Sequence, residues 1–275
     1  MGFIFYTKQL RTQCPILLFP NKSNFYLIGR GVNKLINLLK SHRTVRKYKN
    51  EKISDEVLYE LINAAQYASS SSFLQSYSVI HIKDRNKIKK IGTLSNNELQ
   101  FNTAALSLVF CADYNKVKQA MQIHETNYTF DSIENFLVAT IDTSIFAQNF
   151  AIAAESKGYG VCYIGGIRNN PKQINDILSI PDYVLPLFGM TVGVPDENNE
   201  IKPRLPISSV IHTDKYRKDK ILENIEAYDK IMMDYYTNRG KNNRNDTWSS
   251  SIINLMSKKE RLHLKEFIMS KGFLT

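Results

Sequence analysis

D-S-I-E-N-F-L-V-A-T-I-D-T-S-I-F-A-Q-N-F-A-I-A-A-E-S-K, residues 131–157, is a long apolar helical pattern rich in alanine. Gly158 follows it, at the position where a glycine commonly ends a helix. A helix that is apolar all round is buried in a protein core or in a subunit interface. The sequence therefore predicts a long buried helix over 131–157.

Strand patterns lie on both sides of this helix. The expected strands are 78–83, 106–112, 160–164, which Gly165-Gly166 closes, and 185–194. Further helices are expected at 32–39, at 55–68, after Pro171 and around 220–236, with a weakly helical stretch between the first two strands and an irregular polar stretch over 238–251. This alternation predicts an α+β or mixed α/β domain with a small sheet inside helices.

The positive charge of the chain is concentrated near its N-terminus. The 275 residues carry a net charge of +10, and 43% of them are hydrophobic, which suits one large or two small soluble domains. Residues 1–50 hold ten Lys or Arg and no acidic residue, which leaves 26 basic and 26 acidic residues in the rest. A protein that binds duplex nucleic acid usually spreads its basic residues over one face. We therefore expect no nucleic-acid partner, and residues 1–33 form a basic extension of unknown role.

The cysteines and the apolar runs indicate a cytoplasmic protein. Cys14, Cys111 and Cys162 are odd in number and have no C-x-x-C spacing, which indicates reduced thiols and no zinc framework. We expect no metal. No apolar run approaches the roughly 20 residues that span a bilayer, and the N-terminal run 16–19 is too short for a signal peptide. We expect no membrane partner.

Residues 42–46, H-R-T-V-R, form the densest group of nitrogen-rich side chains. Arg43 and Arg46 are three apart, so in a first helical turn they would share a face and could grip phosphate oxygens. The alternative is a solvated basic turn. The motifs of Rossmann, P-loop, serine hydrolase and zinc protease sites are missing from the sequence. An enzyme of this kind would borrow its chemistry from a cofactor.

Eight stretches together resemble the flavin-dependent nitroreductase family, in its NADPH-dependent branch of oxygen-insensitive nitroreductases and flavin reductases. They are H-R-T-V-R-K-Y at 42, S-S-S-S-F-L-Q at 69, V-F-C-A-D at 109, A-A-E-S-K-G at 153, Y-I-G-G-I-R-N-N at 163, L-P-L-F-G at 185, K-P-R-L-P at 202 and R-G-K-N-N-R-N-D-T-W at 239. They stand in the family's order and spacing, and the resemblance covers residues 34–275.

The resemblance implies an α+β sandwich with a small, mainly antiparallel sheet surrounded by helices. It also implies a homodimer with FMN at the subunit interface and a C-terminal arm, about 207–275, that exchanges with the partner. NADPH would reduce the FMN, and a nitroaromatic, a quinone or a flavin would then take two electrons in a ping-pong cycle. No side chain would be catalytic, because FMN carries the chemistry.

The resemblance also assigns residues by position. FMN contacts would come from His42, Arg43, Thr44, Arg46, Ser70, Gln75, Glu98, Gln100, Tyr163, Ile164, Gly165, Gly166, Lys202 and Arg204. Contacts to NADPH or substrate would come from Ser72, Phe73, Arg239, Arg244 and Arg261. The bland alternatives are a flexible polar loop for the serines, a glycine turn for 163–166, core packing for Phe73 and a solvated loop for Arg239 and Arg244.

Two further points concern these assignments. Lys202 would lie by the flavin pyrimidine edge, where a cation stabilises the anion formed on two-electron reduction. Glu98 stands where close relatives carry Gln, and its charge would lower the flavin reduction potential; otherwise the loop has shifted and Gln100 takes part.

Two rival functions remain. The enzyme could supply reduced FMN to a partner, or, in a different class, the chain could be a basic anion-binding protein without catalysis. Residues 51–275 carry equal numbers of basic and acidic side chains, which makes the second alternative the weaker one.

Overall fold

The computed structural model describes residues 34–257 and 261–274. Predictions about the extension 1–33, including those for Cys14 and for the start of the helix at 32–39, lie outside the described residues. Four strands form one antiparallel sheet in the order β1-β2-β4-β3. They are β1 (Tyr77–His81), β2 (Leu106–Asp113), β3 (Gly160–Ile164) and β4 (Val184–Gly193). The prediction of a small, mainly antiparallel sheet is confirmed.

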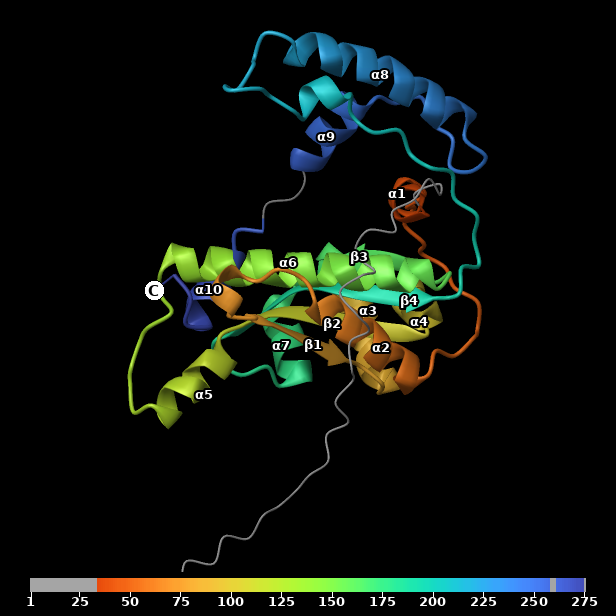
Figure 1. The fold of residues 1–275 in the computed structure, drawn as a ribbon. Helices are drawn as coiled ribbons and strands as arrows, with labels where there is room; N and C mark the ends of the chain where they lie inside the picture. Colours follow the sequence, from red (N-terminus) through yellow and green to blue (C-terminus); the bar gives the residue numbers. More distant parts are fainter. Residues whose placement is uncertain (1–33, 258–260, 275) are drawn as a thin grey trace, which may run out of the picture.

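Helices cover both faces of this sheet (Figure 1). On one face lie α2 (Asp55–Gln66) and α6 (Ile133–Ser156); on the other lie α3 (Arg85–Ser95), α4 (Glu98–Thr103) and α7 (Pro171–Leu178). Strand β2 is buried at every position, and its side chains alternate between the two cores. Leu108 and Phe110 face α2 and α6, whereas Val109 faces the other helices. Burial on both faces explains why β2 is an unbroken apolar run.

Helix α6 spans Ile133–Ser156, within the 131–157 that its pattern predicts, but it is not buried all round. Ser132 caps its start by accepting a hydrogen bond from the Asn135 amide at 3.1 Å. Its inner face packs on the sheet, whereas Ile133, Leu137, Ile141 and Ile145 are 39–68% exposed. These four are spaced by four residues and so form one apolar stripe. The inner face of α6 is thus buried in the core, which is one of the two expected forms of burial. The outer stripe is exposed in the single chain and could be buried in a subunit interface, which is the other.

By length and composition alone, α6 could also cross a membrane, which the sequence analysis did not anticipate. Its inner face carries large aromatic residues that pack against the sheet, as in the core helix of a soluble protein. This packing accounts for the hydropathy of α6.

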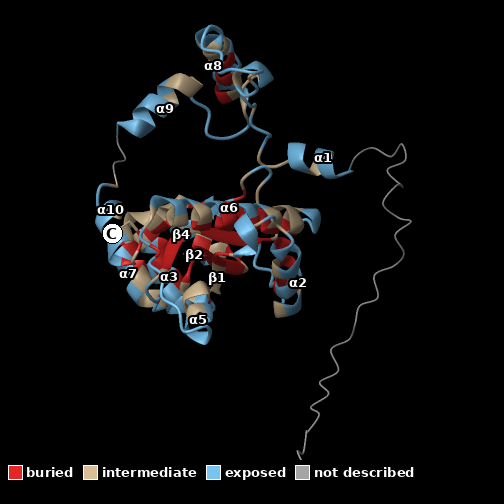
Figure 2. Ribbon diagram, turned by 60° about the vertical axis from the view of Figure 1, so that its left-hand side comes forward, coloured by how far each residue is buried: buried red, intermediate tan, exposed pale blue. Residues whose placement is uncertain are grey.

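The C-terminal arm, residues 207–275, leaves the body of the molecule, which is the sheet with the helices on its two faces, and later returns to it. After η4 (Ile207–Ser209), α8 (Ile221–Asn238) and α9 (Trp248–Met256) form a lobe that stands off from α6, and α10 (Leu264–Ser270) returns to the body (Figure 1). Buried residues concentrate in the body, with a smaller cluster of Tyr228, Met232 and Tyr236 on α8 (Figure 2). The expectation that 238–251 is irregular is wrong at its end, because Thr247 caps α9 there. Helix α5 (Asn115–Ile123) was also not predicted.

The basic segment after α1 (Lys34–Lys40) is fixed to the edge of the sheet. The Val45 amide donates to the Val161 carbonyl at 3.0 Å, and Tyr48 forms a bridge with Pro195. The buried Tyr48 hydroxyl lies 2.7 Å from the Val45 carbonyl oxygen and 2.9 Å from the Thr191 carbonyl oxygen. Burial raises the pKa of this hydroxyl, which therefore stays protonated and donates at neutral pH.

Replacement of this hydroxyl tests the anchor. We expect Tyr48→Phe to lower the free energy of unfolding by about 1–2 kcal/mol, because buried carbonyl oxygens lose their donor. The control is Tyr59→Phe, at a tyrosine that is 66% exposed; it should change the value by less than about 0.5 kcal/mol. Denaturant unfolding measures both variants, and equal effects would contradict the anchoring role.

Candidate functional site

Residues 42–47 belong to no helix or strand, so the expected helical-turn arrangement of Arg43 and Arg46 is wrong. The reason is the anchoring at both ends. At one end His42 Nδ1 lies 2.5 Å from Glu155 Oε1, in the last turn of α6; at the other, Val45 and Tyr48 are buried against the sheet. In this segment Arg43 and Arg46 are both exposed. Although the backbone is not the helical turn that was expected, both side chains line one hollow at the surface, which is described below.

A second segment, 197–204, lies beside the first. The Arg46 amide donates to the Glu197 carboxylate, and Asn199 Nδ2 donates to the Thr44 carbonyl at 2.9 Å. These contacts bring Lys202 and Arg204 to the hollow, as the sequence analysis expected of residues 160 positions away. The Arg204 guanidinium donates to the Lys202 carbonyl at 2.5 Å.

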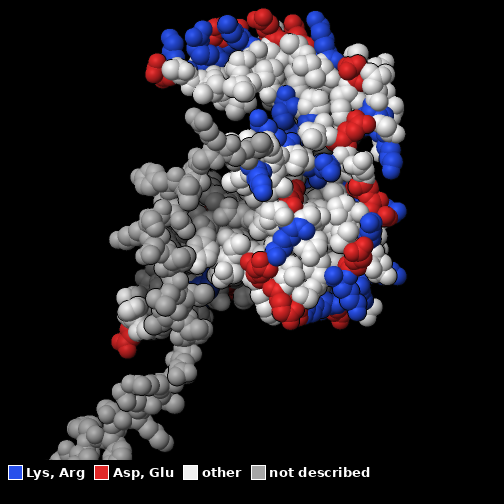
Figure 3. Space-filling view, turned by 45° about the vertical axis from the view of Figure 1, so that its right-hand side comes forward, with Lys and Arg blue, Asp and Glu red and all other residues white. Residues whose placement is uncertain are grey.

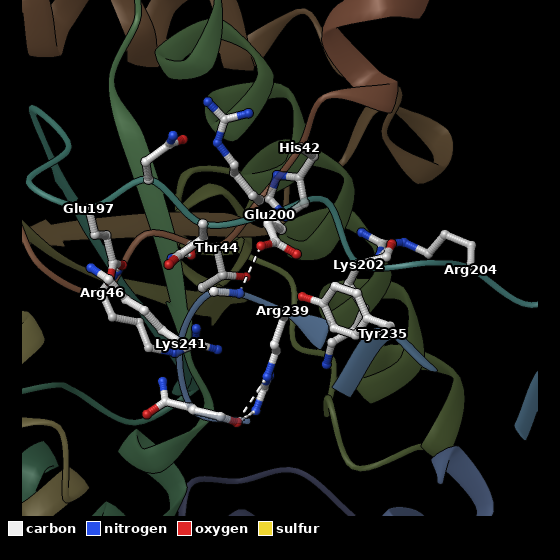
Figure 4. Close-up of a pocket in the computed structure, with 15 residues that line it drawn as sticks. His42, Thr44, Arg46, Glu197, Glu200, Lys202, Arg204, Tyr235, Arg239 and Lys241 are labelled. Carbon is white, nitrogen blue, oxygen red and sulfur yellow. Dashed lines mark hydrogen bonds between the residues drawn. The ribbon is translucent and has the colours of Figure 1, made fainter. Parts of the chain in front are cut away.

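A third segment comes from the arm. The Gly240 amide donates to Glu200 Oε1 at 2.9 Å, and the Arg239 guanidinium donates to the Asn242 carbonyl (Figure 4). The buried Tyr236 ring gathers three cations around it. Lys202 Nζ is 5.6 Å, Arg239 Cζ 4.9 Å and Arg244 Cζ 4.1 Å from its centroid. Cation–π attraction of this kind holds the basic side chains together despite their mutual repulsion.

Together the three segments form a hollow of about 450 Å³, which we call the basic hollow. Six Lys or Arg and two Glu line it, together with His42 and Thr44. Lys and Arg side chains gather on this face, between the lobe and the body (Figure 3). A second hollow of about 530 Å³ adjoins it and combines Lys202, Arg204 and Arg244 with the aromatic rings of Tyr228 and Trp248. A basic hollow beside an aromatic one suits a phosphorylated ligand that also carries a ring system.

The serine segment, residues 70–76, lies away from the basic hollow in the same chain. Ser70 Oγ donates to Asp142 Oδ2 at 2.7 Å, and Ser72 and Phe73 are exposed. Asp142 and Glu155 are thirteen positions apart on α6, which corresponds to about 20 Å along the helix. Within one chain, the structure therefore does not bring Ser70, Ser72, Phe73 and Gln75 to the hollow that contains His42.

The segment 163–166 forms the end of β3 and the start of η3 (Gly165–Asn169). Tyr163 is 38% exposed and Ile164 is buried. A Cβ atom on Gly166 would lie 2.1 Å from the Ser95 carbonyl oxygen, so close backbone packing inside the chain already requires this glycine. Arg261 of the arm reaches the same segment and donates twice to Asn169 Oδ1, at 3.0 and 2.8 Å.

Glu98 and Gln100 lie at the start of α4, where Glu98 is exposed and Gln100 is half-buried. Neither lines the basic hollow. The thiols of Cys111 and Cys162 are free, and burial raises the pKa of both. Neither thiol is therefore suited to act as a nucleophile at neutral pH.

Sequence reasoning missed the carboxylates that organise the site. Glu155, Glu197 and Glu200 each accept a hydrogen bond from a segment of the hollow, and Asp142 accepts from the serine segment. Asp142 alone gave a usable signal, because an acidic residue within an apolar helix must have buried partners. Glu197 and Glu200 stand in a polar stretch, and Glu155 stands at the end of the apolar helix, where a charged residue is ordinary.

Comparison with known proteins agrees with this architecture. Residues 39–194 match the model of the nitroreductase family, and residues 202–275 match the model of the nitroreductase family C-terminal domain. The chain belongs to the nitroreductase family.

Individual relatives match over nearly their whole length. A Cr(VI) reductase of Pseudomonas sp. (strain G-1) is 44% identical over 86% of this chain and 97% of that protein. An FMN reductase (NADPH) of Bacillus subtilis (strain 168) is 37% identical over 88% of this chain and 99% of that protein. The solved structure of the NfrA1 nitroreductase from B. subtilis superimposes with a TM-score of 0.84 at 37% identity, covering 87% of this chain and 99% of that one.

Proposed function

We propose that the chain is an FMN-dependent oxidoreductase that takes electrons from NADPH and reduces small-molecule acceptors. The observation that carries this proposal is the convergence of three basic segments on one hollow in a member of the nitroreductase family. The rival reading as an anion-binding protein without catalysis loses support for the same reason. An FMN reductase (NADPH) among the relatives supports both the cofactor and the electron donor.

The donor set fits FMN. Arg43, Arg46 and Arg204 offer guanidinium groups for the phosphate, and Thr44 offers a hydroxyl group for the phosphate or the ribityl chain. His42 is held in place by Glu155, so its position does not depend on a ligand. Lys202 lies between the two hollows and can place positive charge near the ring system. FMN, when bound, supplies the two-electron chemistry, while these residues bind it and balance its charge.

We infer that the site is completed by a second copy of the chain. The apolar stripe of α6 needs a partner, and two antiparallel copies of α6 about a two-fold axis would be isologous. With the axis near Gln148 and Asn149, midway between Asp142 and Glu155, the Asp142 region of one copy would lie beside the Glu155 region of the other. The serine segment and the basic hollow, about 20 Å apart along α6 within one chain, would then meet between chains. The exchanged arm of residues 207–275 would lie over the partner.

The arm residues point to the electron donor. Arg239 and Arg244 stand at the arm side of the hollows and present guanidiniums around Tyr236. We propose that they meet the 2′-phosphate of NADPH. Arg261, Ser72 and Phe73 would border the acceptor, which is a nitroaromatic, a quinone or a flavin.

Supply of reduced FMN to another protein is the second candidate role, which the relative described as an FMN reductase favours. We expect a cytoplasmic location from the cysteine content.

FMN binding tests the proposal directly. The purified chain should bind FMN with quenching of its fluorescence, and the visible flavin band should bleach when NADPH is added under argon. Arg46→Ala should raise the FMN dissociation constant about tenfold or more, because a charge-assisted hydrogen bond is lost. A protein that takes up no FMN would overturn the proposal.

The matched control for this variant is Lys47→Ala. Lys47 pairs with Asp196 at 2.7 Å and does not line the hollow. Its replacement should change the dissociation constant less than about twofold, because an exposed ion pair contributes little. If both variants bind FMN equally, the assignment of Arg46 fails.

Arg239 is tested by donor preference. Arg239→Ala should lower the ratio of kcat/KM for NADPH to that for NADH by about tenfold or more, because only NADPH carries the 2′-phosphate. Arg217→Ala is the control, at an exposed arginine paired with Asp219 at 2.7 Å. Steady-state kinetics with both donors measures the ratio, and an unchanged ratio in Arg239→Ala would remove this role.

A further inference from the structure

The serine segment has an unusual backbone. Ser72, Phe73 and Gln75 have φ values of 47°, 59° and 51°, although none of them is glycine. Left-handed backbone costs about 1–2 kcal/mol at each such residue. The tip of the segment is exposed, with Phe73 at 80%, so core packing does not impose this conformation. Strain of this kind persists only where surrounding contacts fix it, and it concentrates at ligand sites.

Asp142 supplies those contacts from the middle of α6. Its carboxylate is 1% exposed and accepts four hydrogen bonds from the segment. Ser71 N donates to Oδ1 at 2.9 Å; Ser70 Oγ, Ser76 Oγ and Ser76 N donate to Oδ2 at 2.7, 2.9 and 3.3 Å. The donors come from both sides of the left-handed residues. One buried side chain therefore closes the segment at its two ends.

The hydroxyl of Ser70 links this carboxylate to the strained tip. While it donates to Asp142, it accepts from the Gln75 amide at 2.7 Å. Its only proton is therefore used within the chain. Lys116 braces the outer side, where its ammonium donates to the carbonyls of Gln75 and Tyr77 at 3.2 and 2.6 Å.

The position of Asp142 on α6 relates the serine segment to the proposed FMN site. Asp142 adjoins Ile141 in the sequence, and Ile141 belongs to the exposed apolar stripe. The segment that Asp142 holds therefore lies at the level of this stripe along α6, and we propose that the stripe faces the second copy. A rigid tip there can meet a ligand that the other copy's basic hollow holds, without the entropic cost of ordering a loop.

We infer that Asp142 is a positioning residue for the cofactor: it holds residues 70–76 in the conformation in which their exposed tip meets the FMN bound mainly by the second copy. This inference rests on the proposed function. Asp142 does not touch FMN itself, because its carboxylate is buried and directed to the serine segment. Its effect passes through the shape of the tip.

The variant Asp142→Asn tests the inference with little change in size. An asparagine offers one oxygen in place of two, so its amide group must face either the Ser71 or the Ser76 backbone donor. At least one end of the segment is then released. We expect the FMN dissociation constant to rise about tenfold or more, which is the size of effect that loss of a charge-assisted hydrogen bond typically has.

The matched control is Thr143→Val on the same helix. Thr143 is fully buried and donates to the carbonyls of Ala139 and Cys111, not to the serine segment. We expect both variants to lower the melting temperature, because each removes buried hydrogen bonds. Thr143→Val should nevertheless leave the FMN dissociation constant within about twofold of wild type, because it releases no segment of the site. FMN fluorescence titration and thermal unfolding of the full chain give both values.

The outcomes separate the inference from the proposed function. Wild-type affinity in a folded Asp142→Asn protein, or equal loss in both variants, overturns the positioning role while FMN binding by the wild type stands. A wild type that binds no FMN overturns the proposed function and this inference with it. If Asp142→Asn does not fold, Ser76→Ala removes a single bond to Asp142. Its dissociation constant should rise about threefold, and an unchanged value overturns the inference.

Discussion

The packing of α6 on the sheet is the constraint on which the rest of the structure depends. Its inner face carries Phe146 and Phe150, which contact Phe110 of β2 and bury the centre of the body. Because this face is fixed, every polar residue of α6 has a fixed place too. Glu155 then stands where the basic segment enters, Asp142 stands under the serine segment, and an apolar stripe remains outside.

The basic hollow depends on a balance of charge. Six Lys or Arg would repel one another, and Glu197 and Glu200 are used on backbone amides rather than in ion pairs with them. The Tyr236 ring and the neighbouring carbonyl oxygens offset part of the repulsion. The remaining excess of positive charge favours an anionic ligand, as the proposed function requires, and the second hollow offers the aromatic rings of Tyr228 and Trp248 beside it.

The sequence predicted the parts of the fold that periodicity and glycine control. The existence and approximate positions of α6 and the four strands follow from apolar patterns. The convergence of Arg46 with Lys202 followed from the resemblance. The sequence did not predict that 42–47 is non-helical, because the anchors Val161 and Pro195 are distant in sequence. Helix α9 was missed because its packing against α8, not its composition, stabilises it. The left-handed residues of the serine segment also depend on a distant side chain, Asp142.

The proposed function and the role inferred for Asp142 both require a composite cofactor site, with the basic hollow of one copy and the serine segment of the other. Subunit complementation tests it most directly. Arg46→Ala and Asp142→Asn copies, co-expressed with different tags, give a heterodimer whose FMN occupancy is measured near the wild-type dissociation constant. In a composite arrangement both defects fall in one site and the other is intact, so occupancy should be about half that of wild type. Occupancy as low as in the two variant homodimers would contradict the account, because each site would then lie within one chain.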